Sequence, residues 1–474
     1  MDDKIKNYDY PLNISADARG LSERWLALSI GSLVIAGLFS VFVVFSRTPF
    51  IQEIFPLKDL FHMALVLHVN FSILIFYSTF TCIFFSIYMG AHSSGGADPT
   101  GGAAAPWRFG AGRIAMWITA AGAAVMALSP LAGAPNPLMN NYIPVLDNPA
   151  FMAGLPVLLT GFFLMAAIAL TSKKPAGNDF SGAAVLRAGI GLAAFVVLAA
   201  SINFTWSYLT IPGSVKDAKY FETLFWGGGH LLQFNHTILM ALAWLCLGSA
   251  VGAAPLKPRI TAFILALYAV PVLGIFLISV VFHADSAEYR HLVTLVMEYG
   301  MGLPPFLIGI PTLLRLAKTP ATSQTRHIKA SLVISMLLFG LGGALGYLIH
   351  GINLTIPAHY HGVTSGVTMS FIGVAYYLLP RMGFSAPGRI AGIQPYFYGV
   401  GQALYIVGLA TAGFQNVQRK VAGAEQGLHT TGKIISMSIM GIGGMISVVG
   451  GVLFLVVVIR SMFFSDRPLF TKNN

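Results

Sequence analysis

Two histidines separated by one residue, His359 and His361, lie in the segment Thr-Ile-Pro-Ala-His-Tyr-His-Gly near the start of a long apolar stretch. In an α-helix each residue advances by about 100°, so positions i and i+2 point to nearly opposite sides of the rod. Neutral imidazole is a good ligand for iron, copper and zinc. One helix that carries this pair could therefore ligate two separate cofactors, one on each side.

Four further histidines also fall in apolar stretches. A lone histidine in such a stretch is more often a hydrogen-bonded packing residue than a ligand. Ionisable groups in hydrocarbon are expensive, however, and several together usually mark a site or a pathway. The sequence therefore predicts a buried metal or haem centre. The four residues are His68, His230, His283 and His350.

The composition places these histidines in a membrane. The 474-residue chain is 56% hydrophobic and only 9% charged, which is typical of a polytopic membrane protein. Apolar runs long enough to cross about 30 Å of hydrocarbon predict about twelve transmembrane helices in one all-α bundle, a single domain over residues 1–474. The expected spans are 24–46, 58–90, 112–131, 148–171, 185–210, 219–252, 259–284, 291–317, 328–350, 356–380, 393–414 and 433–460.

The distribution of charge sets the expected orientation. A net charge of +11 could suit nucleic acid, but most of the 28 Lys and Arg residues fall in the connections on one side of the twelve-span topology. This bias predicts both termini in the cytoplasm, a bacterial or archaeal cytoplasmic membrane, and no nucleic-acid partner. In this topology the histidines at 68, 230, 283, 359 and 361 all lie in the outer half of the bilayer, where they could converge on one centre.

The order of the histidine motifs resembles subunit I of the haem-copper oxidase superfamily, which includes the nitric oxide reductases. Each fragment alone is weak, but together, in this order and on these spans, they are highly specific. The motifs are His-Val-Asn-Phe-Ser at 68–72, Trp-Gly-Gly-Gly-His at 226–230, Phe-His at 282–283 and His-Tyr-His at 359–361.

The resemblance implies two haems, both of which are expected to be of type b. His68 and His361 correspond to the axial ligands of a low-spin haem that relays electrons, and His359 to the proximal ligand of a high-spin haem with an open distal face. Arg419 and Lys420 resemble the basic pair that neutralises haem propionates. The alternative for these two is a pair of solvated loop charges.

The resemblance also implies a non-haem metal held by His230 and His283. The family normally has two adjacent histidines on the seventh span, whereas this chain has Phe-His-Ala-Asp, which makes Asp285 the expected third ligand. A carboxylate is a harder donor than imidazole and suits iron better than Cu(I), so iron is expected, with copper as the alternative. Asp285 could instead cap the helix end or face the outer water.

The expected substrate depends on a missing phenol. Oxygen-reducing members use a tyrosine one turn after the histidine of the sixth span, where this chain has Phe234, or a tyrosine on the seventh span, where it has Ile275, Phe276 and Leu277. The resemblance therefore favours the reduction of nitric oxide to nitrous oxide. A terminal oxidase that reduces O₂ to water, as a cytochrome c or quinol oxidase subunit I, is the alternative.

One acidic residue is expected to serve the catalytic centre. Glu298, in Val-Met-Glu-Tyr-Gly on the eighth span, looks like the counterpart of a glutamate near the non-haem iron of nitric oxide reductases. A buried carboxyl has a raised pKa and can hand protons to a reduced intermediate. A packing role is the alternative, and Glu288 and Tyr289 could line a short route from the outer side.

The sequence contains no motif for a cofactor that would receive electrons from an external donor. It has no Cys-x-x-Cys-His haem-attachment motif, and its two cysteines, Cys82 and Cys246, lie in different expected spans. A partner subunit of cytochrome c or cupredoxin type, or quinol, should deliver electrons. The rival class is a secondary transporter, which twelve spans and many glycines would also suit and which would contain no haem.

Overall fold

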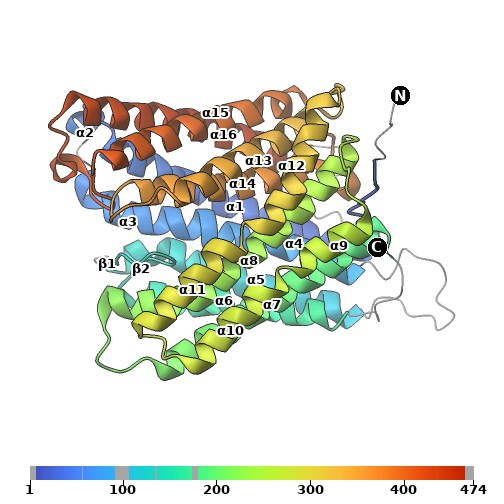
Figure 1. Ribbon diagram of the computed structural model, residues 1–474, viewed down its shortest axis with the longest axis horizontal. Coiled ribbons are helices and arrows are strands. Elements are labelled where there is room, and N and C mark those ends of the chain that lie inside the picture. The colour runs from blue at the N-terminus through green and yellow to red at the C-terminus, as the bar shows by residue number, and fades with distance from the viewer. Residues whose placement is uncertain (1–6, 56, 91–105, 134–135, 173–179, 465–474) are drawn as a thin grey trace. The chain divides into compact units, whose positions relative to one another are not determined.

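The computed structural model describes residues 7–55, 57–90, 106–133, 136–172 and 180–464 (Figure 1). These residues are almost entirely helical, which confirms the predicted all-α membrane fold. The long helices are α1 (Ala16–Arg47), α3 (Lys58–Val69), α4 (Phe76–Gly90), α5 (Pro106–Leu128), α6 (Pro149–Leu170), α7 (Gly182–Thr210), α8 (Asp217–Ala250), α9 (Pro258–Ala266), α10 (Ala269–Val281), α11 (Ala287–Gly300), α12 (Leu303–Lys318), α13 (Arg326–Gly346), α14 (Thr355–Leu378), α15 (Arg389–Phe414) and α16 (Thr431–Phe463).

The remaining elements are short. They are α2 (Ile51–Ile54), the π-helix η1 (Asn70–Ile75), the 3₁₀ turns η2 (Ser129–Ala132), η3 (Pro380–Met382) and η4 (Gly423–Gln426), and the strands β1 (Pro137–Leu138) and β2 (Val145–Leu146). The two strands pair antiparallel in the connection between α5 and α6, with Pro137 opposite Leu146.

Each expected span has a helical counterpart. Within the described residues, eleven helices are long and apolar enough to cross a membrane. The expected tenth span, 356–380, corresponds to α14, which has 24 residues but is not among those eleven. It carries both histidines of the His-Tyr-His motif and several threonines and serines, so the span that bears these candidate ligands is a comparatively polar one.

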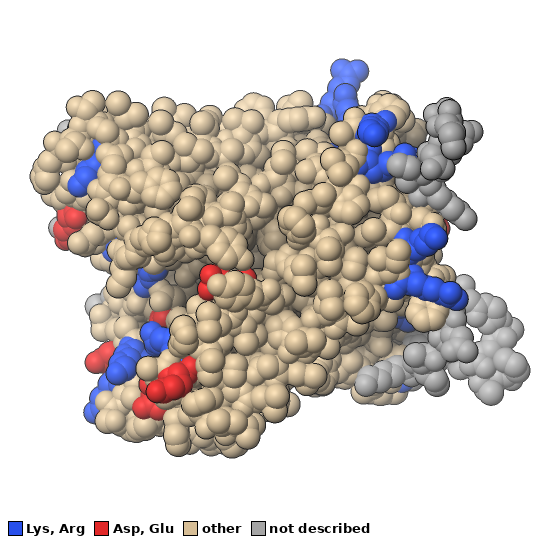
Figure 2. Space-filling view, viewed as in Figure 1, with Lys and Arg blue, Asp and Glu red and all other residues tan. Residues whose placement is uncertain are grey.

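Charged side chains gather near the two ends of the helices, and most of the surface between them is uncharged, apart from a small acidic group near the middle of the view (Figure 2). Large apolar side chains are exposed on the helices: on α9 and α10, for example, Phe263, Val270 and Leu277 are each more than half exposed. Exposed apolar surface of this kind suits lipid rather than water. The chain is therefore a multi-pass membrane protein.

Three expected spans are interrupted rather than continuous. The second span consists of α3, η1 and α4; the seventh breaks between α9 and α10, and the eighth between α11 and α12. The last break precedes Pro304 and Pro305, whose rings favour the start of a helix. Apolar runs alone do not show such breaks.

The π segment begins two residues after His68. Two side chains at this point bond to backbone carbonyls of the preceding turn: Asn70 Nδ2 donates to Val66 O at 2.9 Å, and Ser72 Oγ donates to His68 O at 2.6 Å. Single-turn π segments are rare and recur at functional sites. The π segment therefore makes His68 a candidate functional residue, independently of the ligand chemistry of its imidazole.

The chain divides into two compact units. The first unit consists of Met1–Ser29 with Leu74–Pro320, and the second unit consists of Ile30–Ile73 with Ala321–Asn474. His230, His283, Asp285 and Glu298 belong to the first unit. The other candidates belong to the second unit: His68, His359, His361, Arg419 and Lys420.

Within the second unit, small residues bring helices into backbone contact. A Cβ added to Gly443 of α16 would lie 2.3 Å from the backbone nitrogen of Tyr405 on α15, and one added to Gly342 of α13 would lie 2.3 Å from that of Val363 on α14. Close approach at small residues is a general means of packing membrane helices. These contacts fix α14 and α15, which carry His359, His361 and Tyr405.

Candidate functional site

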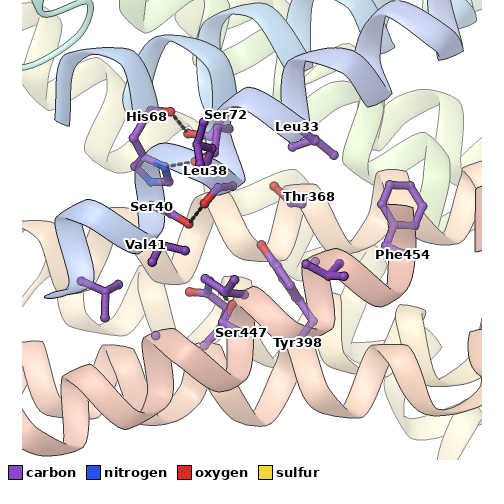
Figure 3. Close-up of a pocket in the computed structure, with 18 of the residues that line it drawn as sticks. Leu33, Leu38, Ser40, Val41, His68, Ser72, Thr368, Tyr398, Ser447 and Phe454 are labelled. Atoms are coloured by element: carbon purple, nitrogen blue, oxygen red, sulfur yellow. Dashed lines mark hydrogen bonds between the residues drawn. The ribbon is translucent and has the colours of Figure 1, made fainter. Parts of the chain in front are cut away.

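A cavity of about 430 Å³ lies within the second unit (Figure 3). His68 and His361 both line it, together with residues from α1, α14, α15 and α16. The volume falls in the range of about 300–1,000 Å³ that is usual for small-molecule and cofactor sites. Most of the other lining side chains are apolar, among them Leu33, Val41, Ile372, Val448 and Phe454.

The ring of His68 is oriented by the backbone of α1. Its Nδ1 lies 3.0 Å from the carbonyl oxygen of Ala36. Because a carbonyl oxygen only accepts, Nδ1 carries the proton and donates it, which leaves the lone pair of Nε2 available to a metal. A carbonyl partner behind a ligating imidazole is the usual arrangement in metal and haem sites.

His361 lies on α14 and is half-buried. Its ring packs edge-on against Tyr405 of α15, with centroids 4.5 Å apart and an interplanar angle of 60°. Gln402, which also lines the cavity, donates to Ser447 Oγ at 2.7 Å, and its side chain lies close enough to interact with His361. Two imidazoles beside one apolar cavity fit a haem with two histidine ligands.

His359 lies two residues before His361 on α14 but is not among the residues that line this cavity. Its Nδ1 donates to the carbonyl oxygen of Gly342 at 2.7 Å, so its Nε2 is the nitrogen left for a ligand. The two histidines therefore serve different surroundings, as their spacing predicted. The role of His359 as proximal ligand of a second haem stays a prediction.

The expected basic pair lies in the connection between α15 and α16. Arg419 and Lys420 are both half-buried, and the backbone carbonyl of Lys420 lies 2.9 Å from Nε2 of His62. They are therefore not fully solvated loop charges. The structure does not test whether they contact haem propionates, so that role stays a prediction.

Sequence reasoning missed a third basic residue, Arg47, at the end of α1. Its side chain is only 5% exposed, and its two hydrogen bonds are long: 3.4 Å from Nε to Gln426 Oε1 and 3.5 Å from Nη2 to Gln418 O. Both partners are neutral oxygens, and a buried cation is costly unless it is well paired. Its surroundings therefore suit an anionic group. The only sequence feature that could have indicated Arg47 was its position at the outer end of an expected span.

In the first unit, His230 is 1% exposed on α8. Its Nδ1 donates to the carbonyl oxygen of Trp226, one turn earlier, at 2.6 Å. The hydroxyl of Tyr142 lies close to both nitrogens of the same ring, 2.7 Å from Nε2 and 2.9 Å from Nδ1. Sequence analysis did not single out Tyr142, because it lies in a connection without any recognisable motif.

The three glycines before His230 make room for aromatic side chains against α8. A Cβ added at any of them would lie 2.1 to 2.6 Å from a side-chain atom of another element. Real Cβ atoms essentially never lie this close to another heavy atom, so a larger residue at any of the three positions would force its neighbour to shift. The neighbours are Tyr289 at Gly227, Phe204 at Gly228 and Tyr142 at Gly229.

The structure does not gather the expected ligands of the non-haem metal. His283 and Asp285 lie in the turn between α10 and α11, and both are exposed. Within the described residues there is no group of three or more His, Cys, Asp or Glu side chains that could hold a metal ion. The set of His230, His283 and Asp285 therefore does not fit a metal as it stands. Glu298 is half-buried on α11.

Two curated proteins are similar in sequence to this chain. A protein of Rickettsia prowazekii (strain Madrid E) described as uncharacterized is 29% identical, over 94% of this chain and 96% of its own length. An uncharacterized protein of Aquifex aeolicus (strain VF5) is 26% identical, over 76% of this chain and 85% of its own length.

The fold is similar to that of a solved heme-copper terminal oxidase dimer, with a TM-score of 0.71 and 15% sequence identity; the match covers 97% of this chain and 86% of that chain. At this identity the likeness concerns the fold alone. The sequence model described as "Cytochrome C and Quinol oxidase polypeptide I" matches residues 22–455. The chain therefore belongs to this family of membrane-embedded respiratory oxidoreductase subunits, which act on a gaseous substrate at haem and metal centres.

Proposed function

We propose that this chain is the catalytic subunit of a complex that reduces nitric oxide: two NO, two electrons and two protons give N₂O and water. The observation that carries the redox role is the pair His68 and His361, which line one apolar cavity. When bound, the two haems would supply the electron-transfer and redox chemistry. The protein supplies position, ligation and exclusion of water.

The residues around the cavity have separable roles. Nε2 of His68 would ligate the low-spin haem, because Ala36 accepts the Nδ1 proton, and Tyr405 packs against the ring of His361, the proposed second ligand. The apolar lining excludes water and keeps the local dielectric low, which stabilises a neutral, ligated imidazole. Arg47, Arg419 and Lys420 are the basic groups proposed to neutralise haem propionates.

Three features support nitric oxide as the substrate. One turn after His230 stands Phe234, whose ring packs edge-on against Tyr268 with centroids 6.3 Å apart. Neither α8 at this turn nor α10 at Ile275 offers a phenol that could supply both a proton and an electron for cleaving O–O. Glu298, half-buried on α11, is the proposed proton donor, and it need deliver only protons.

Dioxygen is the second candidate substrate, because one observation favours it. The phenol of Tyr142 contacts His230 from outside the two expected spans, so the site does contain a tyrosine. If this hydroxyl donates a hydrogen atom to a reaction intermediate, reduction of O₂ to water becomes feasible without a tyrosine on the sixth or seventh span.

The two candidates are separated by assays on one sample. The complex would be purified with its electron-donating partner, for which we propose a subunit of cytochrome c or cupredoxin type, and supplied with NO or O₂. We expect N₂O formation to exceed O₂ consumption at least tenfold. Rapid O₂ consumption with negligible N₂O would reject our proposal in favour of the oxidase, and a preparation without haem would reject both.

The same preparation tests the proposed orientation. In vesicles, both termini should be accessible from the side that corresponds to the cytoplasm, and protons should be consumed from the opposite side during turnover. Proton uptake from the cytoplasmic side would contradict the proposed route through the half-buried Glu298.

A further inference from the structure

We propose that the N-terminal segment, residues 7–12, is a seal that closes one end of the first unit to water and so keeps proton uptake at the opposite side. This inference rests on the proposed function and its orientation, because it concerns the side from which that reaction takes its protons. The segment runs past the connection between α8 and α9, residues 251–257, at the end of the unit that is expected to face the cytoplasm (Figure 1).

The connection between α8 and α9 is partly buried, which is unusual for a loop. Ala253 is fully buried, and Ala254 is only 2% exposed. Buried backbone groups need hydrogen-bond partners. The N-terminal segment supplies them, since the carbonyl oxygen of Ala254 accepts from the backbone nitrogen of Tyr8 at 2.9 Å and its nitrogen donates to Oδ1 of Asn7 at 2.9 Å. The connection therefore depends on the segment for the pairing of its own backbone.

Tyr10 fills the space between this connection and the start of α9. Its side chain is fully buried, and its hydroxyl donates to Leu256 O at 2.8 Å and lies 2.7 Å from Thr261 Oγ1. Burial raises the pKa of this phenol to about 12, so it stays neutral at physiological pH. A neutral phenol with two hydrogen-bond partners leaves no polar group free to draw water into the gap.

The segment also contacts α8 and α7. Oγ of Ser249, near the end of α8, accepts from the backbone nitrogen of Tyr10 at 3.0 Å and donates to Oδ1 of Asp9 at 3.1 Å. At the start of α7, the carbonyl oxygen of Asp9 occupies the space that a Cβ on Gly182 would take. The segment is therefore packed against the ends of three helices, α7, α8 and α9, rather than laid loosely over them.

Buried polar side chains continue inward from this sealed end. Thr261, to which the phenol of Tyr10 bonds, is fully buried, and so is Tyr268, seven residues later. The hydroxyl of Tyr268 lies close enough to Thr237 of α8 to interact with it, and its ring packs against Phe234, one turn after the α8 histidine. Buried polar groups hold water wherever water can enter. The segment thus separates the water on its side from polar groups that extend to the turn of α8 beside the candidate site.

The two cysteines of the chain can report whether the seal is closed. Cys246 lies three residues before Ser249 on α8 and is 2% exposed, whereas Cys82 on α4 is fully buried. The purified complex would be treated with a water-soluble maleimide, and labelling of this chain would be quantified by mass spectrometry. In Tyr10→Ala we expect Cys246 to react about tenfold faster and Cys82 to stay unreactive, because the opening is local. Asn13→Ala, at an exposed position just after the segment, is the control.

Proton movement separates a seal from a segment that only stabilises the fold. The complex would be placed in vesicles, and the decay of an imposed pH difference would be followed without substrate. We expect the decay to be several-fold faster in Tyr10→Ala than in the parent or in Asn13→Ala, with the haem content unchanged. During turnover, Tyr10→Ala should also take protons from the side of the N-terminus. Tyr10→Phe, which keeps the ring but loses the hydroxyl bonds, should be intermediate and serves if Tyr10→Ala does not fold.

The outcomes distinguish this inference from the proposed function. If the parent forms N₂O but Cys246 stays protected and the vesicles stay tight in both Tyr10 variants, the seal is wrong and the proposed function stands. If Cys82 and Cys246 become reactive together, the segment stabilises the whole unit and the seal is again wrong. Labelling and passive proton decay need no turnover, so a parent that reduces only O₂ would reject the proposed substrate while the seal is still decided by these two measurements.

Discussion

Nδ1 of His359 and the carbonyl oxygen of Gly342 are 2.7 Å apart, a bond between α14 and α13. It exists because the two helices touch at glycine, where a Cβ on Gly342 would lie 2.3 Å from the backbone nitrogen of Val363. The orientation of the proposed high-spin haem ligand therefore depends on a residue with no side chain.

Replacing that glycine should release the ligand. In Gly342→Ala the helices must separate, so the His359 ring loses its carbonyl partner, and we expect the high-spin haem signal to fall several-fold while the low-spin signal persists. Gly340→Ala and Gly343→Ala on the same helix are matched controls, since a Cβ at either meets nothing within 4 Å. Electron paramagnetic resonance of the oxidised protein distinguishes the two haems. Equal spectra for all three variants would contradict the proposed role of the glycine.

The two imidazoles of the cavity should act as a pair. Removing either ligand, in His68→Ala or His361→Ala, should abolish low-spin haem and lower the haem content to about one per chain. His350→Ala, at an exposed position, should leave the haem content as in the parent. Haem per chain is measured by extraction and quantification. A full low-spin spectrum in either cavity variant would remove the basis of the electron relay.

Arg47 should tune the low-spin haem. It is buried, and it lies close enough to His361 to interact with it electrostatically. In Arg47→Met the loss of a nearby positive charge favours the oxidised haem, so the midpoint potential should fall by about 60 mV, which is a tenfold shift in a one-electron equilibrium. Arg460→Met, near the end of α16, is the control. A spectroelectrochemical titration measures both, and an unchanged potential would argue against an electrostatic role for Arg47.

Glu298 should matter for protons and not for cofactors. In Glu298→Gln the carboxyl can no longer transfer a proton, and N₂O turnover should fall about 100-fold, the usual range for loss of a general acid. Haem content and spectra should not change. Asp217→Asn, an exposed acid at the start of α8, is the control. If the turnover of Glu298→Gln stays within a factor of two of the parent, Glu298 is not the proton donor, and the alternative of a packing role is correct.

The spans and the histidine positions could be predicted because apolar runs and motif order are local properties of the sequence. The pairing of His68 with His361, which line one cavity, came from the family resemblance, since span order by itself does not say which histidines meet. The fit of Tyr142 against His230 could not be predicted, since it depends on a contact 88 positions away in sequence, made by a connection without periodicity. Arg47 was missed for a similar reason: its burial depends on a loop far along the chain, at Gln418 and Gln426.

The expectation that the seventh-span turn gathers metal ligands depended on family spacing rather than on the local sequence. His283 and Asp285 follow the end of α10 at Val281, and the chain turns before α11 begins. A histidine just beyond a helix end is not held by helical geometry, so spacing along the chain cannot fix its direction. The same reasoning explains why His359 and His361, inside α14, behaved as their spacing predicted.

The π segment after His68 has a consequence for how this helix tolerates change. A widened turn carries one residue more than an α-helical turn, and α4 beyond it is buried on every side. Deleting a single residue from Asn70–Ile75 would therefore restore a regular helix and leave His68 in nearly the same rotation relative to α4, because the wide turn has already absorbed that residue. A deletion within the regular helix α4 would instead turn the residues on its two sides by about 100° relative to one another, so the wide turn is the place where this helix best tolerates the loss of a residue.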